Sequence, residues 1–231
     1  VWDAIQDIAA MIHREDPNHP TSTVTAVLDS NEVHEVLRRA PDIDIYGFNT
    51  YGDIGGHSDN IRKFGWAGPY IISEWGPNGH WEVAKTEWGA PIEQSSTEKA
   101  ASYRNRYLKY IEAKKGECIG SYVFLWGQKQ ETTSTWYGLF TAEGQPTEPV
   151  DELYKLWRNT SPPNSAPSIS DFTLEGKKAG QSIKLTAGYD YSAAVEHKDE
   201  NGDKLDVQWL IYPEATNTKA GGDFENSLPP V

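Results

Sequence analysis

Strand-like and helix-like segments alternate along residues 1–158, and this alternation limits the possible folds more than any single motif. Runs of β-branched and aromatic residues predict buried strands, at residues 21–28, 43–48, 69–73 and 119–125. Helical patterns accompany them, at residues 1–14, behind Asp29-Ser30-Asn31 to residue 39, at 57–64, from Ser95 or Ser96, and from Pro149. Strands that alternate with helices build a parallel sheet through right-handed crossovers, so we expect an α/β fold.

The pattern changes after a linker-like stretch at residues 159–167, which reads NTSPPNSAP. Residues 168–231 predict a small all-β, immunoglobulin-like domain, with short strands at 169–174, 182–187, 193–197 and 205–212 and a turn at Asn201-Gly202. An immunoglobulin-like sandwich needs about seven strands, so we expect this domain to be incomplete. The predicted domains are therefore 1–158 and 168–231.

The composition is that of a folded chain whose partner is not a polyanion. Aromatic residues make up 12 % of the sequence, with nine Trp and twelve Tyr, whereas disordered chains have few aromatic residues. The net charge of −13 opposes nucleic acid and anionic membrane surfaces, because binding to phosphates depends on Lys and Arg. No run of about 20 apolar residues predicts a transmembrane segment. The start lacks a signal-peptide pattern and falls inside a helical pattern, so we expect the natural start to be missing.

Metal and cofactor sites have little support in the sequence. A single cysteine, Cys118, excludes an intrachain disulfide, and its place before an apolar run favours a buried structural thiol. The six histidines show no HExxH spacing, which argues against catalytic zinc. Asp199, Asn201 and Asp203 alternate as in calcium loops, but an Asn-Gly turn explains them better, since Leu210 stands where an EF-hand loop needs Glu. We expect no metal and no cofactor.

Chemically useful side chains gather at the ends of three of the four predicted strands. These ends read Gly47-Phe48-Asn49-Thr50-Tyr51, Ser73-Glu74-Trp75-Gly76 and Leu125-Trp126-Gly127-Gln128. Reactive residues of (β/α) barrels lie at the carboxyl ends of the strands. Aromatic rings also suit the apolar faces of sugars, although core packing is their commoner use.

The same segments resemble a known enzyme family. IDIYGFNTYG, PYIISEWGPNGHWE and SYVFLWGQKQE resemble the sixth, seventh and eighth strands of clan A glycoside hydrolases, nearest to family 2, and HREDPNHPTSTVTAV resembles the approach to the fifth strand. The resemblance covers about residues 1–158 in order and spacing. It implies the C-terminal half of a (β/α)8 TIM barrel, strands 5 to 8, and a retaining glycosidase whose nucleophile is Glu74.

The resemblance also implies roles for the neighbouring residues. Tyr51 or Asn49 would hydrogen bond the nucleophile, and Trp126 would form the floor of the sugar subsite next to the scissile bond. Further substrate-binding candidates lie nearby, namely Trp75, Gln128, His80 and Trp81. Ordinary roles in loops or in the core remain open for each of them.

One essential part of the mechanism has no counterpart in the sequence. Retaining hydrolysis needs a second carboxylic acid about 5 to 5.5 Å from the nucleophile. The glutamates that could be considered do not occupy the position of the family's acid/base residue; they are Glu15, Glu82, Glu87 and Glu131. We therefore expect the chain alone to be inactive, with its open barrel edges covered by a second copy in a homodimer or by a missing N-terminal half.

Two other functions fit the same residues. A noncatalytic carbohydrate-binding protein would use the same scaffold, because a fold does not determine function. A transglycosylase would share the first chemical step and differ only in what attacks the intermediate. In each case the partner is a carbohydrate, and we expect a secreted, periplasmic or cell-surface location. Sugar identity, linkage, and exo or endo action are left open.

Overall fold

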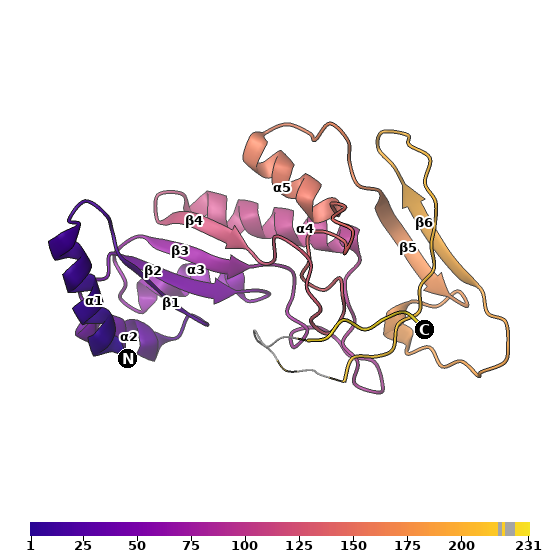
Figure 1. The fold of residues 1–231 in the computed structure, drawn as a ribbon, viewed down its shortest axis with the longest axis horizontal. Helices are drawn as coiled ribbons and strands as arrows, with labels where there is room; N and C mark the ends of the chain where they lie inside the picture. The colour runs from indigo at the N-terminus through magenta and orange to yellow at the C-terminus, as the bar shows by residue number, and fades with distance from the viewer. Residues whose placement is uncertain (217–218, 220–224) are drawn as a thin grey trace. The chain divides into compact units, whose positions relative to one another are not determined.

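The predicted alternation of strands and helices is present as a four-stranded parallel sheet (Figure 1). The structure is a computed structural model that describes residues 1–216, 219 and 225–231. The strands follow one another across the sheet in chain order, as β1 (Ser22–Thr25), β2 (Ile45–Thr50), β3 (Tyr70–Trp75) and β4 (Cys118–Val123). This confirms an α/β fold with a parallel sheet. Its identity as half of a barrel stays a prediction.

The helices begin and end largely where local signals place them. The α-helices are α1 (Trp2–Glu15), α2 (Ser30–Arg39), α3 (Ile54–Lys63), α4 (Ser96–Arg106) and α5 (Glu148–Arg158). A short π-helix, η1 (Tyr107–Ile111), follows α4, and two 3-10 helices are η2 (Glu112–Lys114) and η3 (Ala179–Gln181). The Asp29 carboxylate caps α2 by accepting from two backbone N–H groups, as predicted. Helix α3 starts at Ile54, earlier than the expected residue 57. Across the described ranges, no helix has both the length and the apolar character of a membrane span.

The chain folds into two compact units that do not follow the chain in a simple order. The first, here called the sheet unit, comprises residues 1–76 and 105–124 and contains the parallel sheet. The second, here called the cavity unit, comprises residues 77–104 and 125–231. The predicted division into 1–158, 159–167 and 168–231 stays a prediction.

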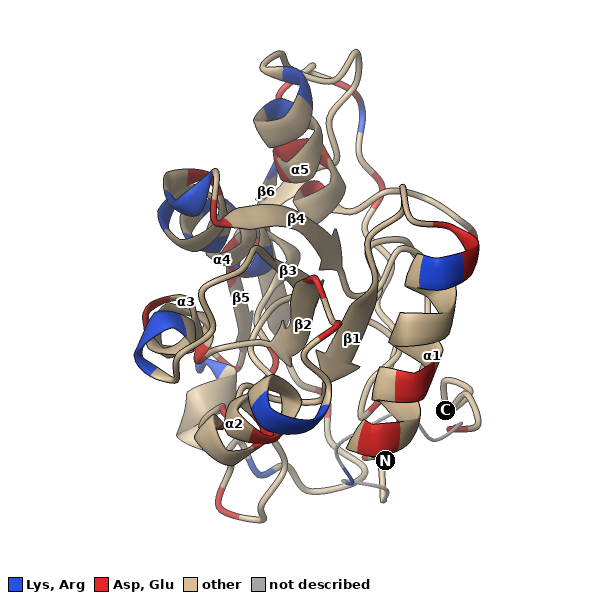
Figure 2. Ribbon diagram, turned by 90° about the vertical axis from the view of Figure 1, so that its left-hand side faces the viewer, with Lys and Arg blue, Asp and Glu red and all other residues tan. Residues whose placement is uncertain are grey.

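One face of the parallel sheet forms the core of the sheet unit. Tyr46, Phe48, Tyr70 and Ile72 are paired across β2 and β3 and are completely buried. Figure 2 shows α2 and α3 along one side of these strands, where right-handed crossovers place them. Val24 on β1 is 48 % exposed. Parallel sheets are normally covered on both faces, so this exposed apolar residue marks a surface that the chain itself leaves open.

Glycine is required at one point of the sheet where neighbouring strands approach closely. A Cβ at Gly47 would lie 2.7 Å from the Val24 side chain and 3.0 Å from the Thr23 carbonyl oxygen. Below this unit's surface, Cys118 is a buried free thiol, as predicted, and burial raises the pKa of that thiol. A raised thiol pKa suits a structural cysteine rather than a nucleophile.

The region after the linker contains fewer strands than predicted. Strands β5 (Ser168–Leu174) and β6 (Ala193–Lys198) pair antiparallel, which confirms the expected strands at 169–174 and 193–197. The expected strands at 182–187 and 205–212 are absent, and this prediction was wrong. Their alternating residues remain mostly exposed without a partner strand, and alternation alone cannot supply one. The immunoglobulin-like fold stays a prediction.

The Asn201-Gly202 turn is present, and its geometry accounts for the acidic residues around it. Gly202 has a φ of 82°, in the left-handed region. The Asp199 carboxylate accepts hydrogen bonds from the backbone N–H groups of Asn201 and Asp203. Asp199 therefore stabilises the turn itself, as such short side chains commonly do.

Candidate functional site

Glu74 lies at the carboxyl end of β3, where strand pairing is irregular. Phe48 pairs with Ile72, whereas the next residue, Asn49, pairs with Glu74, so Ser73 is an extra residue on β3. The pairing of β3 with β4 is also shifted between Ile72 and Trp75. Bulges of this kind change the direction of a side chain and are frequent beside active sites. Here the irregularity leaves Ser73 and Glu74 partly exposed, between the buried Ile72 and Trp75.

Tyr51 holds one oxygen of the Glu74 carboxylate. Its hydroxyl group donates a hydrogen bond to Oε1 of Glu74. The Tyr51 side chain is itself constrained, because the residue is only 8 % exposed and the Phe124 ring meets it edge-on, with ring centroids 6.2 Å apart. Within the described residues, Oε2 of Glu74 makes no hydrogen bond to protein. The carboxylate therefore has one positioned oxygen and one that is available for chemistry.

A polar network after β2 positions Tyr51, and the sequence interpretation missed it. Asp53 accepts hydrogen bonds from the Thr50 hydroxyl at 2.8 Å and from the Tyr51 backbone N–H at 3.3 Å. His57 joins this network through Nδ1 to Thr50 at 2.8 Å and through Nε2 to Asp53 at 3.1 Å. The signal that could have identified it is the His that follows Asp53 four positions later, at helical spacing.

Asn49 has a different partner from the one that the resemblance implies. Its Oδ1 accepts a hydrogen bond from the Ser73 hydroxyl at 2.9 Å. The loop that follows β3 is fixed separately, because Arg106 donates to the carbonyl oxygen of Gly76. Of the two residues predicted to contact the nucleophile, Tyr51 has the contact and Asn49 ties β2 to the bulged residue beside it.

Trp75 belongs to the core of the sheet unit. It is 0 % exposed, and its ring lies 6.3 Å from that of Tyr107. The expected substrate contact through Trp75 is corrected accordingly, since the ring has no surface to offer a sugar. The physical reason is the irregularity at Ser73, which breaks the alternation and places both Ile72 and Trp75 among buried residues.

Trp126 and Gln128 lie in the cavity unit. Trp126 is 58 % exposed, with its ring 5.2 Å from Phe140 in an edge-on contact and 6.3 Å from Trp157 in a stacked one. Gln128 donates to the Ser134 carbonyl oxygen at 3.0 Å, which holds its own loop. Trp126 thus offers an open aromatic face of the type that binds sugar rings, whereas the Gln128 amide is engaged locally.

His80 and Trp81 form an aromatic cluster with Trp136 in the same unit. His80 is buried, with its ring 5.0 Å from Trp81 and 6.0 Å from Trp136. Trp136 is anchored by its indole N–H, which donates to the Asn78 carbonyl oxygen at 2.9 Å. A Cβ at Gly79 would lie 2.5 Å from the Trp81 ring, so glycine permits the ring to cover the backbone. Trp81 is the exposed member and His80 is packed beneath it.

The glutamates considered for the acid/base role have local partners. Glu131 pairs with Lys129 at 2.5 Å, and Glu87 pairs with Lys184 at 2.6 Å. Glu82 accepts from the Gly79 backbone N–H at 2.7 Å, and Glu15 accepts from Arg14 at 3.0 Å. None of these contacts involves Glu74. The acid/base role therefore remains unassigned within the chain.

Comparison with known proteins finds distantly similar solved structures and no family. No family model matches the sequence, and no curated protein matches it. Among solved structures, a GH2 β-galacturonidase from Eisenbergiella tayi bound to galacturonate has a TM-score of 0.49 at 12 % identity, covering 69 % of this chain and 30 % of that chain. A calcium-binding mutant of β-glucuronidase 2 from Bacteroides uniformis has a TM-score of 0.49 at 12 % identity, covering 84 % and 30 %. A GH128 exo-β-1,3-glucanase from Aureobasidium namibiae has a TM-score of 0.45 at 12 % identity, covering 66 % and 58 %.

All three of these proteins are glycoside hydrolases by name, and the chain spans less than two thirds of each of them. At these scores the similarities establish neither a family nor an activity for this chain.

Proposed function

We propose that this chain is part of a retaining glycoside hydrolase, with Glu74 as the catalytic nucleophile. The observation that supports this most is the hydrogen bond from Tyr51 to Glu74 between the carboxyl ends of adjacent parallel strands. A carboxylate at this place on a (β/α) scaffold occupies the usual position of catalytic groups.

Each oxygen of Glu74 has its own part in the reaction. Oε2 attacks the anomeric carbon of the sugar, the glycosidic C–O bond breaks, and a glycosyl ester forms on Glu74. The leaving oxygen takes a proton from a carboxylic acid that another part of the barrel supplies. Water then attacks the ester, and the same acid residue, now acting as a base, accepts its proton. Tyr51 keeps the carboxylate oriented through both steps, which saves the cost of ordering it in the transition state.

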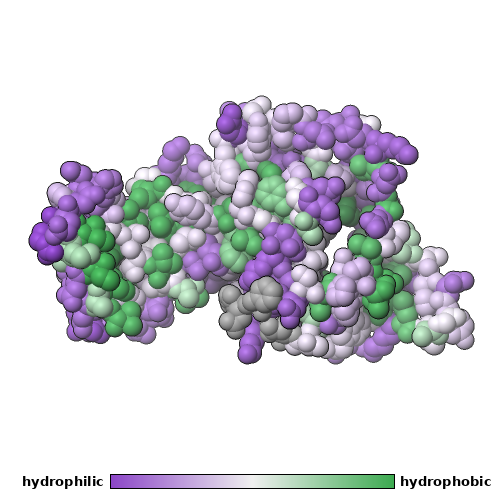
Figure 3. All heavy atoms as spheres, in the orientation of Figure 1, coloured by the Kyte–Doolittle hydropathy of each residue, from purple (hydrophilic) through white to green (hydrophobic). Residues whose placement is uncertain are grey.

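The open surface of the sheet unit supports the proposal that another polypeptide segment covers it. Strands β1 and β4 are the two edges of the sheet. Apolar residues are exposed on and near these strands, including Val24, Val27, Ile119 and Tyr122. Figure 3 shows hydrophobic surface over this part of the chain. Unpaired strand edges with apolar neighbours favour association, so we propose that the other half of a barrel, or a second copy of the chain, covers them.

A covalent trap tests the assignment of Glu74. In the complete enzyme, an activated 2-fluoro glycoside should form a slowly hydrolysed ester, and mass spectrometry of peptides should locate the sugar on Glu74. Because Gln cannot form this ester, Glu74→Gln should carry no label. A label on another residue, or rapid turnover by the Glu74→Gln variant, would overturn the assignment. If the complete protein with Glu74 in place binds sugars but shows no turnover, it is a carbohydrate-binding protein instead.

The chain by itself is the second test. We expect the 231-residue polypeptide to hydrolyse no member of a panel of aryl glycosides, because the second carboxylic acid is not assigned to any of its residues. Light scattering on the same sample gives its oligomeric state. A folded monomer with glycosidase activity would contradict both the half-barrel interpretation and the supply of the acid from elsewhere.

A further inference from the structure

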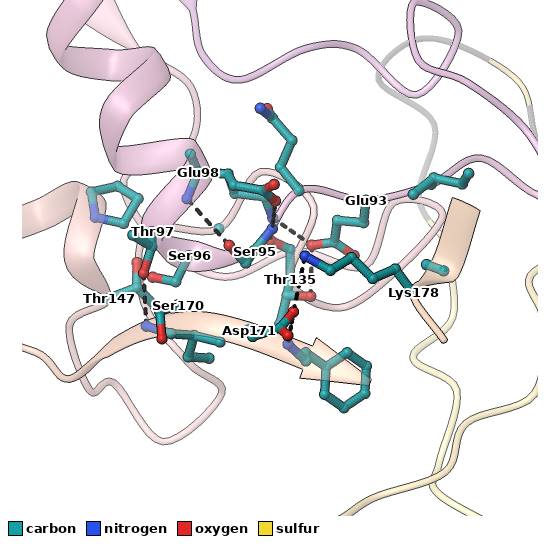
Figure 4. A pocket seen from close by; sticks show the side chains of 18 of the residues that line it. Glu93, Ser95, Ser96, Thr97, Glu98, Thr135, Thr147, Ser170, Asp171 and Lys178 are labelled. Carbon is teal, nitrogen blue, oxygen red and sulfur yellow. Dashed lines mark hydrogen bonds and ion pairs between the residues drawn. The ribbon is translucent and has the colours of Figure 1, made fainter. Parts of the chain in front are cut away.

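A cavity of about 800 Å³ lies within the cavity unit, and the proposed chemistry at Glu74 makes no use of it. Its walls come from the residues around the start of α4, from the loops that precede α5, and from β5 with the turn behind it. Figure 4 shows side chains from these segments pointing toward one another around the space. The volume is within the range of small-molecule sites, roughly 300–1,000 Å³.

The lysines that line the cavity are already neutralised by the protein. The Lys99 ammonium pairs with Glu93 and donates to the Thr135 carbonyl oxygen at 2.7 Å, and its side chain is only 9 % exposed. Burial lowers the pKa of Lys99, an effect that Glu93 opposes. Lys178 pairs with Asp171 at 3.1 Å. No lysine of this lining is left to bind a phosphate or another anion, because each has its carboxylate partner.

The carboxylates are occupied as well. Glu93 also accepts hydrogen bonds from the hydroxyls of Thr133 at 2.6 Å and Thr135 at 2.9 Å. Glu98 accepts from the Ser95 backbone N–H at 2.8 Å, which caps α4. Carboxylates in such pairs and caps do not form a cation site. The lining therefore favours a ligand without net charge.

The rest of the lining combines two kinds of surface. Hydroxyl groups are contributed by Ser and Thr residues, and apolar surface by Ile92, Phe140, Ile169 and Phe172. Phe172 is 54 % exposed and stacks on Trp209, with ring centroids 5.7 Å apart and an interplanar angle of 26°. Flat aromatic surface beside hydrogen-bonding groups is complementary to a sugar, which has apolar C–H faces and a rim of hydroxyls.

We propose that this cavity is a binding site for a neutral saccharide, with a sugar ring against Phe172 and its hydroxyls toward Asp171 and the Ser and Thr groups of the lining. The hydroxyls of Thr135, Thr147 and Ser170 already donate to protein oxygens, so what they offer a ligand is acceptor lone pairs, which suit the donating hydroxyls of a sugar. An anion would find no available cation in the lining. The site does not require Glu74, so it holds whether or not the chain is catalytic.

The test uses the whole chain with Glu74→Gln, which removes the proposed nucleophile. The 15N-labelled protein is titrated by NMR with neutral oligosaccharides, namely cello-, laminari-, xylo-, manno- and galacto-oligosaccharides. We expect at least one series to shift the amide signals of residues 92–99 and 169–172 together. If no series shifts them at millimolar concentration, the proposal is wrong. Failure of the glycosidase proposal would leave this result unchanged.

A cavity-filling substitution gives an independent test. Gly180 lines the cavity, and nothing lies within 4 Å of a Cβ placed there, so Gly180→Leu adds a side chain in open space. We expect binding to weaken by roughly tenfold or more, because the added side chain displaces atoms of the ligand. Gly56→Leu is the matched control, because Gly56 lies in the sheet unit and a Cβ placed there has its nearest neighbour at 3.9 Å. This variant should bind as the parent does.

Phe172→Ala should also weaken binding several-fold. If the Gly180→Leu and Phe172→Ala chains both fold and both bind with the affinity of the parent, the proposal is wrong. Should Gly180→Leu fail to fold, the NMR mapping and Phe172→Ala decide the matter without it.

Discussion

The sheet unit and the cavity unit use their carboxylates in opposite ways. In the sheet unit, hydrogen bonds from Arg39, Arg38 and Lys114 lower the pKa values of acidic side chains, namely Asp3, Glu35 and Asp59. The Thr21 backbone N–H does the same for Asp44. In the cavity unit, burial raises the pKa values of Glu148 and Asp151. Among the acids with a shifted pKa, those of the sheet unit therefore pair with donors near the surface, and those of the cavity unit are partly buried.

The difference follows from what each carboxylate connects. Asp151 accepts from the Ala166 backbone N–H at 2.6 Å, and Glu148 accepts from the Thr97 hydroxyl, which in turn accepts from the Ile169 N–H at 2.8 Å. These bonds join α4, α5, the segment before β5 and β5 itself, which share no strand ladder with one another. The sheet unit has regular hydrogen bonding and needs no such buried acceptors. We infer that the first unit is organised for rigid placement of Glu74, and the second for joining α4, α5 and β5 around a cavity.

The largest expected effect separates the two units by function. Glu74→Gln should lower the turnover of the complete enzyme by at least about 10³-fold, because the amide cannot form the glycosyl ester. Saccharide binding in the cavity unit should be unchanged, as measured by titration of the same variant. Loss of saccharide binding together with turnover would show that the two units do not act separately.

Two tryptophans sharpen the comparison through stability. Trp75→Ala removes a completely buried ring and should reduce the free energy of unfolding by about 3–5 kcal/mol. Trp126→Ala removes a ring that is largely exposed, and should cost less than about 1 kcal/mol while weakening substrate binding and turnover together. Urea unfolding and steady-state kinetics measure both. A large loss of stability in Trp126→Ala with unchanged kinetics would instead make Trp126 a core residue.

Tyr51→Phe tests the positioning of the nucleophile. The variant keeps the packing against Phe124 and removes only the hydrogen bond to Glu74, so turnover should fall by about 10–100-fold, and the free energy of unfolding should change by roughly 1 kcal/mol. The ratio of kcat to KM changes is informative, because a positioning role lowers kcat more than it raises KM. A loss of stability with unchanged kcat and KM would instead indicate a structural role for the Tyr51 hydroxyl.

The smallest expected effect is on pH dependence, and its sign differs between the units. Glu148 and Asp151 have raised pKa values, so the folded state binds their protons more tightly, and their contribution to stability falls as pH rises from their ordinary values through the raised ones. Asp44 has a lowered pKa, so its contribution is present above its ordinary value and is lost as pH falls through the lowered one.

Matched amide variants measure this difference. Thermal unfolding between about pH 3 and pH 7 should become less sensitive to rising pH in Asp151→Asn, which can still accept from Ala166, and less sensitive to falling pH in Asp44→Asn. Changes in the same direction in both variants would contradict the contrast.

Much of the sheet unit could be predicted from local patterns. Buried parallel strands have continuous apolar runs, and Tyr70-Ile71-Ile72 before Glu74 is such a run, so both the strand and the carboxylate at its end are readable in order. The Asp29 cap depends on neighbours along the chain, and α2 begins directly after it. In the cavity unit, Pro149 likewise lies in the first turn of α5. The single Cys118 before an apolar run correctly predicted a buried thiol.

The tertiary structure alone decided the direction of side chains around Glu74 and the fate of the last strands. The extra residue at Ser73 depends on pairing with β2 and β4, and it places Trp75 in the core although it adjoins Glu74 in sequence. Residues 182–187 and 205–212 alternate as strands do, yet a strand exists only where a partner supplies its hydrogen bonds. The sequence determines where strand-like runs lie and which chemical groups follow them, because these depend on near neighbours. Register, burial and the cavity depend on residues far apart in the chain, so only the folded structure could define them.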